Sequence, residues 1–253
     1  MRTKLFLATI LLLAPLPALA DVTARYAVGG KELVVEVDDG GNSRIGVDGK
    51  FAIIRRDGTD YIAISDKEGP KVFELQAMID LFKGILPKSK EEEADAFEFA
   101  LAPGAAVAIA GQQGNAWNLV MVKGDDESKK KHIEMVMSAD PALEPVGTVF
   151  RRSVASLIGL AGAMFPEKSG FTARLTELFD KGALLRVRPV DQGAEKPEPA
   201  LIEFKSFDTA EIDAKHFELP APVTSADEIF GAMGALMNPG GEGGEGSAIK
   251  NLP

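Results

Sequence analysis

Closely spaced glycine turns are the feature that most restricts how this chain can fold. Between residues 21 and 66, four turn sequences separate short apolar runs: Gly29-Gly30, Asp39-Gly40-Gly41-Asn42, Asp48-Gly49 and Asp57-Gly58. Gly-Gly and Asp-Gly pairs adopt the positive φ angles that tight hairpin turns require. Residues 21–66 therefore predict a meander of short antiparallel strands.

Apolar and polar residues alternate along this meander, which is typical of a sheet packed on one side and wet on the other. The residues expected on the packed face are Leu33, Val35, Val37, Ile45, Val47, Tyr61 and Ala63. The residues expected on the opposite face are Glu32, Glu36, Arg44 and Asp48.

Beyond the meander, the period of the apolar residues changes several times. Helical spacing predicts helices at 76–86, 153–165 and 171–181, and we expect Gly182 to be the left-handed residue that ends the third helix. Further strands are expected at 97–101, 106–110, 117–122, 132–137, 184–190 and 200–207. Together these elements predict an α+β fold.

The first twenty residues have the order of a secretory signal peptide. A basic start, Met1–Lys4, precedes the apolar run Leu5–Pro17, and Ala18-Leu19-Ala20 fits the small-x-small cleavage pattern. The apolar run is short for a membrane span of about twenty residues, although an uncleaved anchor is the alternative. We therefore expect cleavage after Ala20, export to the periplasm and no integral membrane span in the mature chain.

Composition excludes several classes of chemistry. The chain has no cysteine, which excludes disulfides, thiol nucleophiles and thiolate-bound metals. Its two histidines, His132 and His216, leave little for zinc, which takes three or four ligands. The net charge of −10, or −12 after loss of Arg2 and Lys4, argues against nucleic acid binding.

No residue pattern in the chain predicts catalysis or a resident cofactor. His132 and Glu134 lie two apart on a predicted strand, so both side chains share one face, and an enzyme would need them to converge with other acidic groups in a cleft. Asp38–Asn42 does not match the spacing of a calcium loop. We therefore expect no catalytic residues, no metal and no cofactor.

Methionine residues, together with predicted helices rich in small side chains, suit an apolar cavity between the sheet and the helices, because methionine adapts to variable partners. An ordinary packed core is the alternative interpretation. The residues expected to line the cavity are Met78, Phe82, Met121, Met135, Leu157, Ile158, Met164, Phe165, Leu175 and Phe179.

The region 225–253 differs in composition from the rest. Ile229, Met233, Leu236 and Met237 form one stripe of an amphipathic fragment, and a Gly/Glu-rich run at 239–246 predicts disorder. We thus expect one folded domain at 21–224. If the fragment 226–237 docks a partner, the chain is instead an envelope interaction protein with no small-molecule ligand.

Three short motifs carry a resemblance to a known family. They are Ile109-Ala110-Gly111 before Trp117–Val122, Lys181-Gly182 before Leu184–Val190, and Ile212-Asp213 before Phe217-Glu218-Leu219-Pro220. With the meander, over 21–222, they resemble the periplasmic lipoprotein-carrier-like superfamily of LolA and LolB types, in particular a branch of exported domains without an assigned function. Gln112-Gln113 replaces the aromatic or cysteine usual in that branch.

The resemblance implies a curved antiparallel sheet, a half-open barrel, with helices packed over its concave face and an apolar cavity for acyl chains. It brings no catalytic residues. The function expected from it is a periplasmic binding or carrier module for a lipid, an acylated protein or another apolar ligand.

Overall fold

The structure is a computed structural model, and it describes residues 21–67, 69–85, 97–123, 130–164, 170–191, 197–225 and 228. The predicted signal peptide at 1–20 and almost all of the region from 226 onward lie outside the described residues. The same holds for Phe165, one of the residues expected in the cavity.

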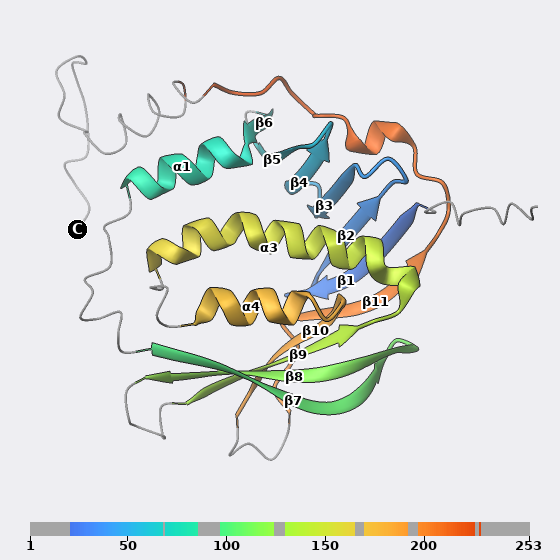
Figure 1. The fold of residues 1–253 in the computed structure, drawn as a ribbon. Coiled ribbons are helices and arrows are strands. Elements are labelled where there is room, and N and C mark those ends of the chain that lie inside the picture. Colours follow the sequence, from blue (N-terminus) through green and yellow to red (C-terminus); the bar gives the residue numbers. More distant parts are fainter. Residues whose placement is uncertain are drawn as a thin grey trace, which may run out of the picture.

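Eleven strands form one antiparallel sheet in the order β6-β5-β4-β3-β2-β1-β11-β10-β9-β8-β7 (Figure 1). The strands are β1 (Val22–Val28), β2 (Lys31–Val37), β3 (Ser43–Val47), β4 (Phe51–Arg56), β5 (Thr59–Asp66), β6 (Gly69–Glu74), β7 (Phe97–Ile109), β8 (Gln112–Lys123), β9 (Lys131–Ser138), β10 (Ala183–Val190) and β11 (Ile202–Asp208). Strands β6 and β7 are the two edges, so the sheet is open and is not closed into a barrel.

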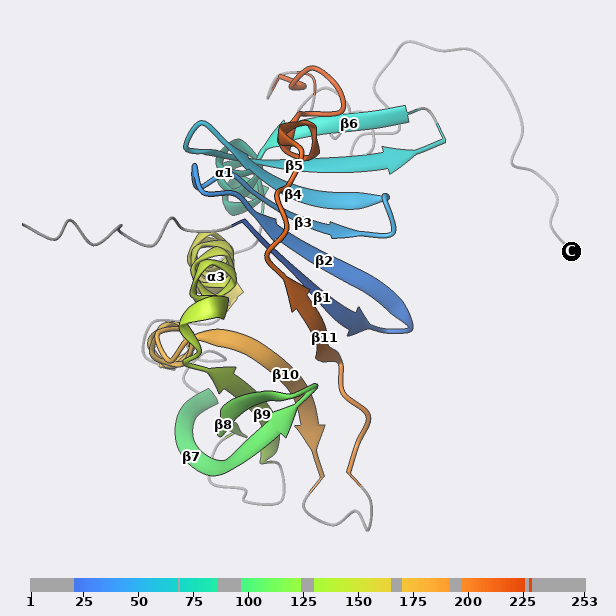
Figure 2. The ribbon, with the colours of Figure 1, turned by 90° about the vertical axis from the view of Figure 1, so that its right-hand side faces the viewer.

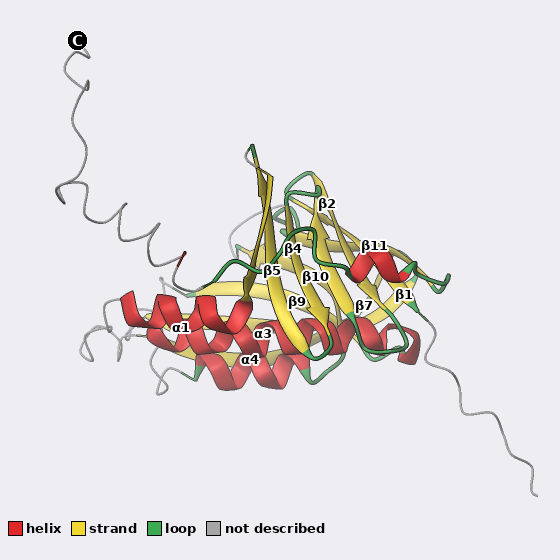
Figure 3. Cartoon of the chain, turned by 90° about the horizontal axis from the view of Figure 1, so that it is seen from above, coloured by secondary structure: helices red, strands yellow, loops and turns green. Residues whose placement is uncertain are grey.

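In the described part of the chain, three α-helices lie on one face of the sheet, which curves around them (Figures 2 and 3). They are α1 (Leu75–Ile85), α3 (Glu144–Met164) and α4 (Phe171–Phe179), and two 3-10 turns accompany them, η2 (Pro141–Leu143) and η4 (Ala214–Phe217). The α+β class with a curved antiparallel sheet is therefore confirmed. None of the helices in the described ranges is long and apolar enough to cross a membrane.

The predicted hairpin turns are confirmed by their backbone angles. Asp48 and Asp57 adopt φ of 51° and 50°, and the glycines that follow them adopt 65° and 82°. Between β2 and β3, which the turn at 38–42 joins, Leu33 faces Val47 and Val35 faces Ile45, as the alternation predicts.

The predicted face of Tyr61 and Ala63 is wrong. Ile62, between them, packs with Leu75 and Ile79 of α1, so Tyr61 and Ala63 point to the opposite face. The alternation misleads here because apolar residues cover both faces of β4 and β5.

Four features also differ from the prediction. The strands expected at 97–101 and 106–110 are one strand, β7, because its pairing with β8 continues through an irregularity between Pro103 and Ala106. Helix α3 begins at Glu144, nine residues before the expected start at 153. Strand β6 was not predicted, and Gly182 has a φ of 131° rather than an ordinary left-handed angle.

The main core lies between the helices and the middle of the sheet. Tyr26 of β1 is fully buried, and its ring meets Phe150 of α3 and Phe204 of β11 edge-on, with centroids 5.5 Å apart in both pairs. Its hydroxyl donates a hydrogen bond of 2.9 Å to the carbonyl oxygen of Leu184 in β10. Tyr26 thereby joins β1 to a strand two positions away in the sheet.

Arg152 anchors α3 on the first half of the sheet. Its guanidinium donates a hydrogen bond of 2.6 Å to Ser43 Oγ and lies 3.6 Å from Asp60 Oδ1. Arg55 pairs with the other oxygen of Asp60 at 2.8 Å. Burial lowers the pKa of Arg152, Asp60 opposes this shift, and Arg55 adds to it.

The chain after β11 crosses the face of β1–β6 that lies opposite the helices (Figure 2). We call residues 209–225 the C-terminal strap. Asp21 Oδ2 accepts a hydrogen bond of 2.7 Å from the backbone N–H of Ile212, and His216 Nδ1 lies 2.7 Å from Glu36 Oε1. Phe217, only 3% exposed, is the buried anchor of the strap.

The last part of the strap covers the outer side of β4–β6 and reaches the edge of the sheet. Leu219 and Ala221 pack against a small cluster made of Ala52, Ile54, Ala63 and Val72. Val223 forms a parallel bridge with Val72, and Thr224 N–H donates to Val72 O at 2.7 Å. The strap therefore occupies backbone groups at the β6 edge.

Candidate functional site

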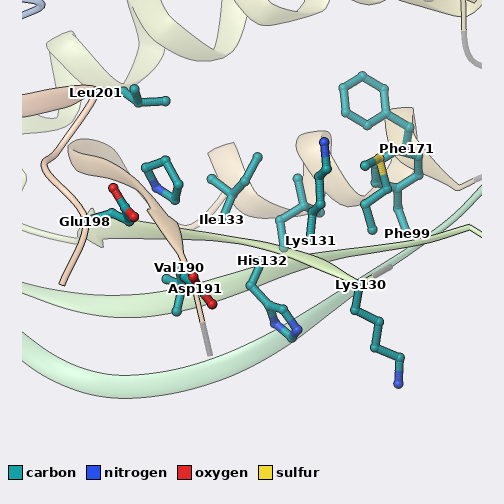
Figure 4. A pocket seen from close by; sticks show the side chains of 13 residues that line it. Phe99, Lys130, Lys131, His132, Ile133, Phe171, Val190, Asp191, Glu198 and Leu201 are labelled. Carbon is teal, nitrogen blue, oxygen red and sulfur yellow. The ribbon is translucent and has the colours of Figure 1, made fainter. Parts of the chain in front are cut away.

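A cavity of about 970 Å³ opens between the ends of β7–β10 and the start of α4 (Figure 4). Most of its lining is apolar: Phe99, Leu119, Met121, Ile133, Phe171, Pro189, Val190 and Leu201. Its charged and polar lining residues are Lys130, Lys131, His132, Asp191 and Glu198. We call this site the cavity.

Strand register explains why the apolar wall is continuous. Leu119 faces Ile133 in β9, and Ile133 faces Pro189 in β10, so these three side chains form one row across the sheet. Phe99, Met121 and Lys131 form the next row in the same way. Since side chains on paired strands share a face at facing positions, both rows point to the same side.

The first turn of α4 covers one end of this wall. The ring of Phe171 lies 4.8 Å from the ring of Phe99, centroid to centroid. Gly170 begins the helix with a positive φ of 73° and accepts a hydrogen bond from Arg174 N–H. Phe99 and Leu119 are buried at 9% and 4% exposure, whereas Leu201 is 53% exposed. The wall thus has a closed floor and an apolar entrance.

Lys131 is the charged group that shares the apolar side of the wall. Figure 4 shows Lys131 and Ile133 on one side of β9 and His132 on the other. The lining therefore combines apolar side chains with Lys131 on the same side of β9, and Lys131, Asp191 and Glu198 are all exposed.

Glu134, the predicted neighbour of His132, is held by two arginines. Its carboxylate lies 2.7 Å from Arg186 Nη2 and 2.9 Å from Arg188 Nη2, and all three side chains are at most 21% exposed. A carboxylate with two such partners is occupied by charge-assisted hydrogen bonds. Within the described ranges, no three His, Asp or Glu side chains group closely enough to hold a metal ion.

Of the ten residues predicted for the cavity, the structure places Met121 in its lining. Met135 and Phe179 are buried in the main core, and Leu175 packs against that core. Met78 packs against the buried residues under α1, and Ile158 is half-buried on α3. Phe82, Leu157 and Met164 belong to α1 and α3, but their side chains lie outside the described part of the structure, as does Phe165.

Sequence reasoning missed most of the lining. Phe99 and Leu119 lie in predicted strands, so the period-two pattern that located those strands could have assigned them to one face. Phe171 was expected only as the start of a helix. Leu201 and Pro189 meet the others through pairing between β9, β10 and the segment before β11, which no local pattern reveals.

Comparison with known proteins gives little. No protein-family model matches the chain, and no curated protein matches it. The crystal structure of MucB shares 13% identity over 81% of this chain and 58% of the MucB chain, with a TM-score of 0.33. The structure of MucB in complex with MucA(peri) shares 11% identity over 81% of this chain and 56% of the other chain, with a TM-score of 0.29. The chain thus spans less than two thirds of MucB, and a likeness at this level says nothing about its function.

Proposed function

We propose that this protein is an exported binding module that holds an apolar ligand, such as a lipid or the acyl chain of an acylated protein, in the cavity. The observation that carries the proposal is the cavity itself. Its volume of about 970 Å³ lies at the upper end of the range typical of small-molecule sites. Eight of its thirteen lining residues are apolar, as such sites require.

The exposure of an apolar side chain beside the cavity supports a ligand-binding site rather than a packing defect. Leu201, at 53% exposure, is among the most exposed large apolar residues of the described chain, and it stands at the cavity entrance. Exposed apolar surface beside a preformed cavity is removed from water when an apolar ligand enters. Export to the periplasm, proposed from the leader at 1–20, would place the protein among envelope lipids and acylated proteins.

The proposal is for binding without chemical conversion of the ligand. Glu134, the acidic neighbour of His132 on β9, is paired with Arg186 and Arg188, so its carboxylate is engaged by their guanidinium groups. The ligand recovered from the protein is therefore expected to have the mass of the ligand added.

Titration with N-phenyl-naphthylamine, an uncharged dye that fluoresces in apolar surroundings, tests the proposal. We expect saturable binding that hexadecanoate displaces. Ile133→Trp fills the cavity with a larger side chain and should weaken dye binding by about tenfold or more. The matched control is Ile64→Trp, because Ile64 is a 40% exposed isoleucine on β5, outside the cavity lining.

The single tryptophan of the chain supplies a second readout. Trp117 lies on β8 two residues before Leu119, so the two side chains share a face, about 7 Å apart along the strand. A ligand in the cavity should change Trp117 emission in proportion to occupancy. Absence of dye binding, or equal loss of binding in Ile133→Trp and Ile64→Trp, would contradict the proposal.

A further inference from the structure

The inward-facing residues of β9 become more exposed toward the start of the strand. Met135 is 6% exposed, Ile133 is half-buried and Lys131 is exposed. Residues two apart on a strand share a face, so these three side chains follow one line along the side of the sheet that carries the cavity. The line is apolar until its exposed end, where the chain places a lysine.

The Lys131 side chain has no charged partner in the described part of the chain, where no residue forms an ion pair or a hydrogen bond with it. The other charged or polar residues near it in the lining differ, because Lys130, His132 and Asp191 each have an interaction partner in the structure. A lysine can lay its methylene groups along an apolar surface and keep its charge in water. Lys131 thus presents an ammonium group at the rim of an apolar wall.

The two sides of the cavity carry opposite charges. Figure 4 shows Lys131 on the side of Ile133 that leads to Phe171, and Glu198 near Leu201 on the other side. Glu198 is exposed and belongs to the lining. A negative group on a ligand is therefore attracted at Lys131 and repelled at Glu198. An apolar chain with one anionic head has a favoured direction, with its head at Lys131 and its chain across Ile133 toward Leu201.

We propose that the cavity binds a single-chain amphiphile with an anionic head, a carboxylate or a phosphate, and that Lys131 pairs with this head. The inference rests on the proposed function, because it specifies the ligand of the same cavity. Phe99 and Met121 lie in the same row across the sheet as Lys131, so the carbons next to the head meet apolar side chains. A lysine ammonium is a compact point charge that can pair with either anion.

Displacement of N-phenyl-naphthylamine at about pH 8 compares ligands that share one alkyl chain: hexadecanoate, hexadecyl phosphate and uncharged hexadecanol, all below the concentration at which they form micelles. The wild-type protein should bind the anions about three- to tenfold more tightly than hexadecanol. Added salt should reduce this preference, because salt screens an exposed charge pair. A preference for one of the two anions alone supports the proposal and identifies the head as a carboxylate or a phosphate.

Substitutions of Lys131 assign the preference to this residue. Lys131→Met keeps an unbranched side chain without the charge, so it should bind the anions no more tightly than hexadecanol and should bind the uncharged dye as the wild type does. Lys131→Glu should bind the anions more weakly than hexadecanol, because it places a like charge beside the head. The matched control is Lys50→Met, at an exposed lysine of the turn between β3 and β4 outside the lining, and it should keep the preference.

The outcomes separate this inference from the proposed function. Absence of saturable dye binding to the wild type would contradict the proposed function and this inference with it. Saturable dye binding with equal affinities for the anions and hexadecanol would overturn this inference alone. A preference for the anions that persists in Lys131→Met, or is lost equally in Lys50→Met, would also overturn it.

Discussion

The two halves of the sheet are both antiparallel, but their faces and edges are covered differently. In β1–β6, helices α1 and α3 cover one face, the C-terminal strap covers the other, and Val223 bridges the edge. In β7–β10, the inner face holds the cavity, and the β7 edge has no strand beyond it in the described chain. One half of the sheet is therefore covered on both faces and at its edge, whereas the other half keeps an apolar cavity on its inner face.

The halves are nevertheless not independent bodies. The main core contains Val35 and Ile45 from the first half and Val136 and Leu185 from the second. Helix α3 contacts both, through Arg152 at β3 and β5 and through Gly147, whose Cα lies close to Gly182 and Ala183. A change in either half is therefore expected to affect the stability of the whole.

Gly182→Ala should have the largest effect on stability. A Cβ at this position would overlap the carbonyl oxygen of Ser138, and the φ of 131° is strained for any other residue. Because both obstacles are backbone, we expect a loss of about 4 kcal/mol or more, or failure to fold. Urea denaturation measures it.

Gly46→Ala provides the control for this change, because its Cβ would meet the flexible Arg44 side chain at 3.4 Å and the Phe51 carbonyl oxygen at an ordinary contact distance of 3.9 Å. It should change the unfolding free energy by less than about 1 kcal/mol. Persistent hydrogen-exchange protection of β1–β6 in Gly182→Ala, with β7–β10 exchanging freely, would show that the halves fold separately and would contradict the shared core.

Phe217→Ala should remove the anchor of the strap. Phe217 is 3% exposed on a 3-10 turn that contacts β3 and β4, and truncation of a buried phenylalanine costs about 3–5 kcal/mol. Phe51→Ala, at a 38% exposed phenylalanine, should cost less than half as much. Equal losses in the two variants, measured by urea denaturation, would mean that the strap does not stabilise the first half.

The turns of the first half could be predicted from sequence because their chemistry is local. Asp48-Gly49 and Asp57-Gly58 specify hairpins whatever surrounds them. The face of Tyr61 and Ala63 could not be predicted in this way, because it depends on a strap more than 150 residues further along the chain. Both faces of β5 are apolar, so the period-two pattern carries no information about which face meets the helices.

The cavity shows the same limit. Met121 was identified because methionine is typical of adaptable apolar surfaces, yet Met135, with the same chemistry, lies in the packed core. The difference is one of position along the wall, since Met135 faces Trp117 and lies further into the sheet than Ile133. Residue type predicted an apolar interior, but only strand register and the start of α4 determine which residues line the open part.

Tyr26→Phe tests the hydrogen bond that joins β1 to β10 and should have an intermediate effect on the free energy of unfolding. Removal of the hydroxyl leaves the Leu184 carbonyl without this donor in the core, which should cost about 1–2 kcal/mol near neutral pH. Burial raises the pKa of Tyr26, so the folded state binds the proton more tightly than the unfolded state. The associated stability is present in full below the ordinary tyrosine pKa of about 10 and is lost as pH rises from there toward the folded-state value.

The difference in unfolding free energy between wild type and Tyr26→Phe should therefore shrink as the pH rises above about 10. Tyr61→Phe, at the other tyrosine of the sequence, is the matched variant to measure beside it. An unchanged difference between wild type and Tyr26→Phe across this pH range would show that the Tyr26 hydroxyl titrates equally in both states.

Substitutions in the turn between β7 and β8 should have the smallest effect on the free energy of unfolding. This turn also has nearly the same backbone angles as a turn in the first half of the sheet. Ala110 has a φ of 48° and precedes Gly111 at 83°, which is nearly the backbone of Asp57 at 50° and Gly58 at 82°. The two hairpins thus use one turn conformation, but the second half places there an alanine, whose side chain gains no local hydrogen bond. Asparagine and aspartate tolerate this conformation better.

Ala110→Asn should raise the unfolding free energy by about 0.5–1 kcal/mol, and Asp57→Ala should lower it by a similar amount. Ala108→Gly, at a strand position of the same hairpin, should instead destabilise by about 0.5–1 kcal/mol, because glycine loses more conformational freedom in a strand. If Ala110→Asn and Asp57→Ala shift stability in the same direction, the two turns are not equivalent. If the two substitutions change the unfolding free energy by similar amounts in opposite directions, the two turns have the same conformational preferences. The halves then differ in how their faces and edges are covered and not in their hairpins.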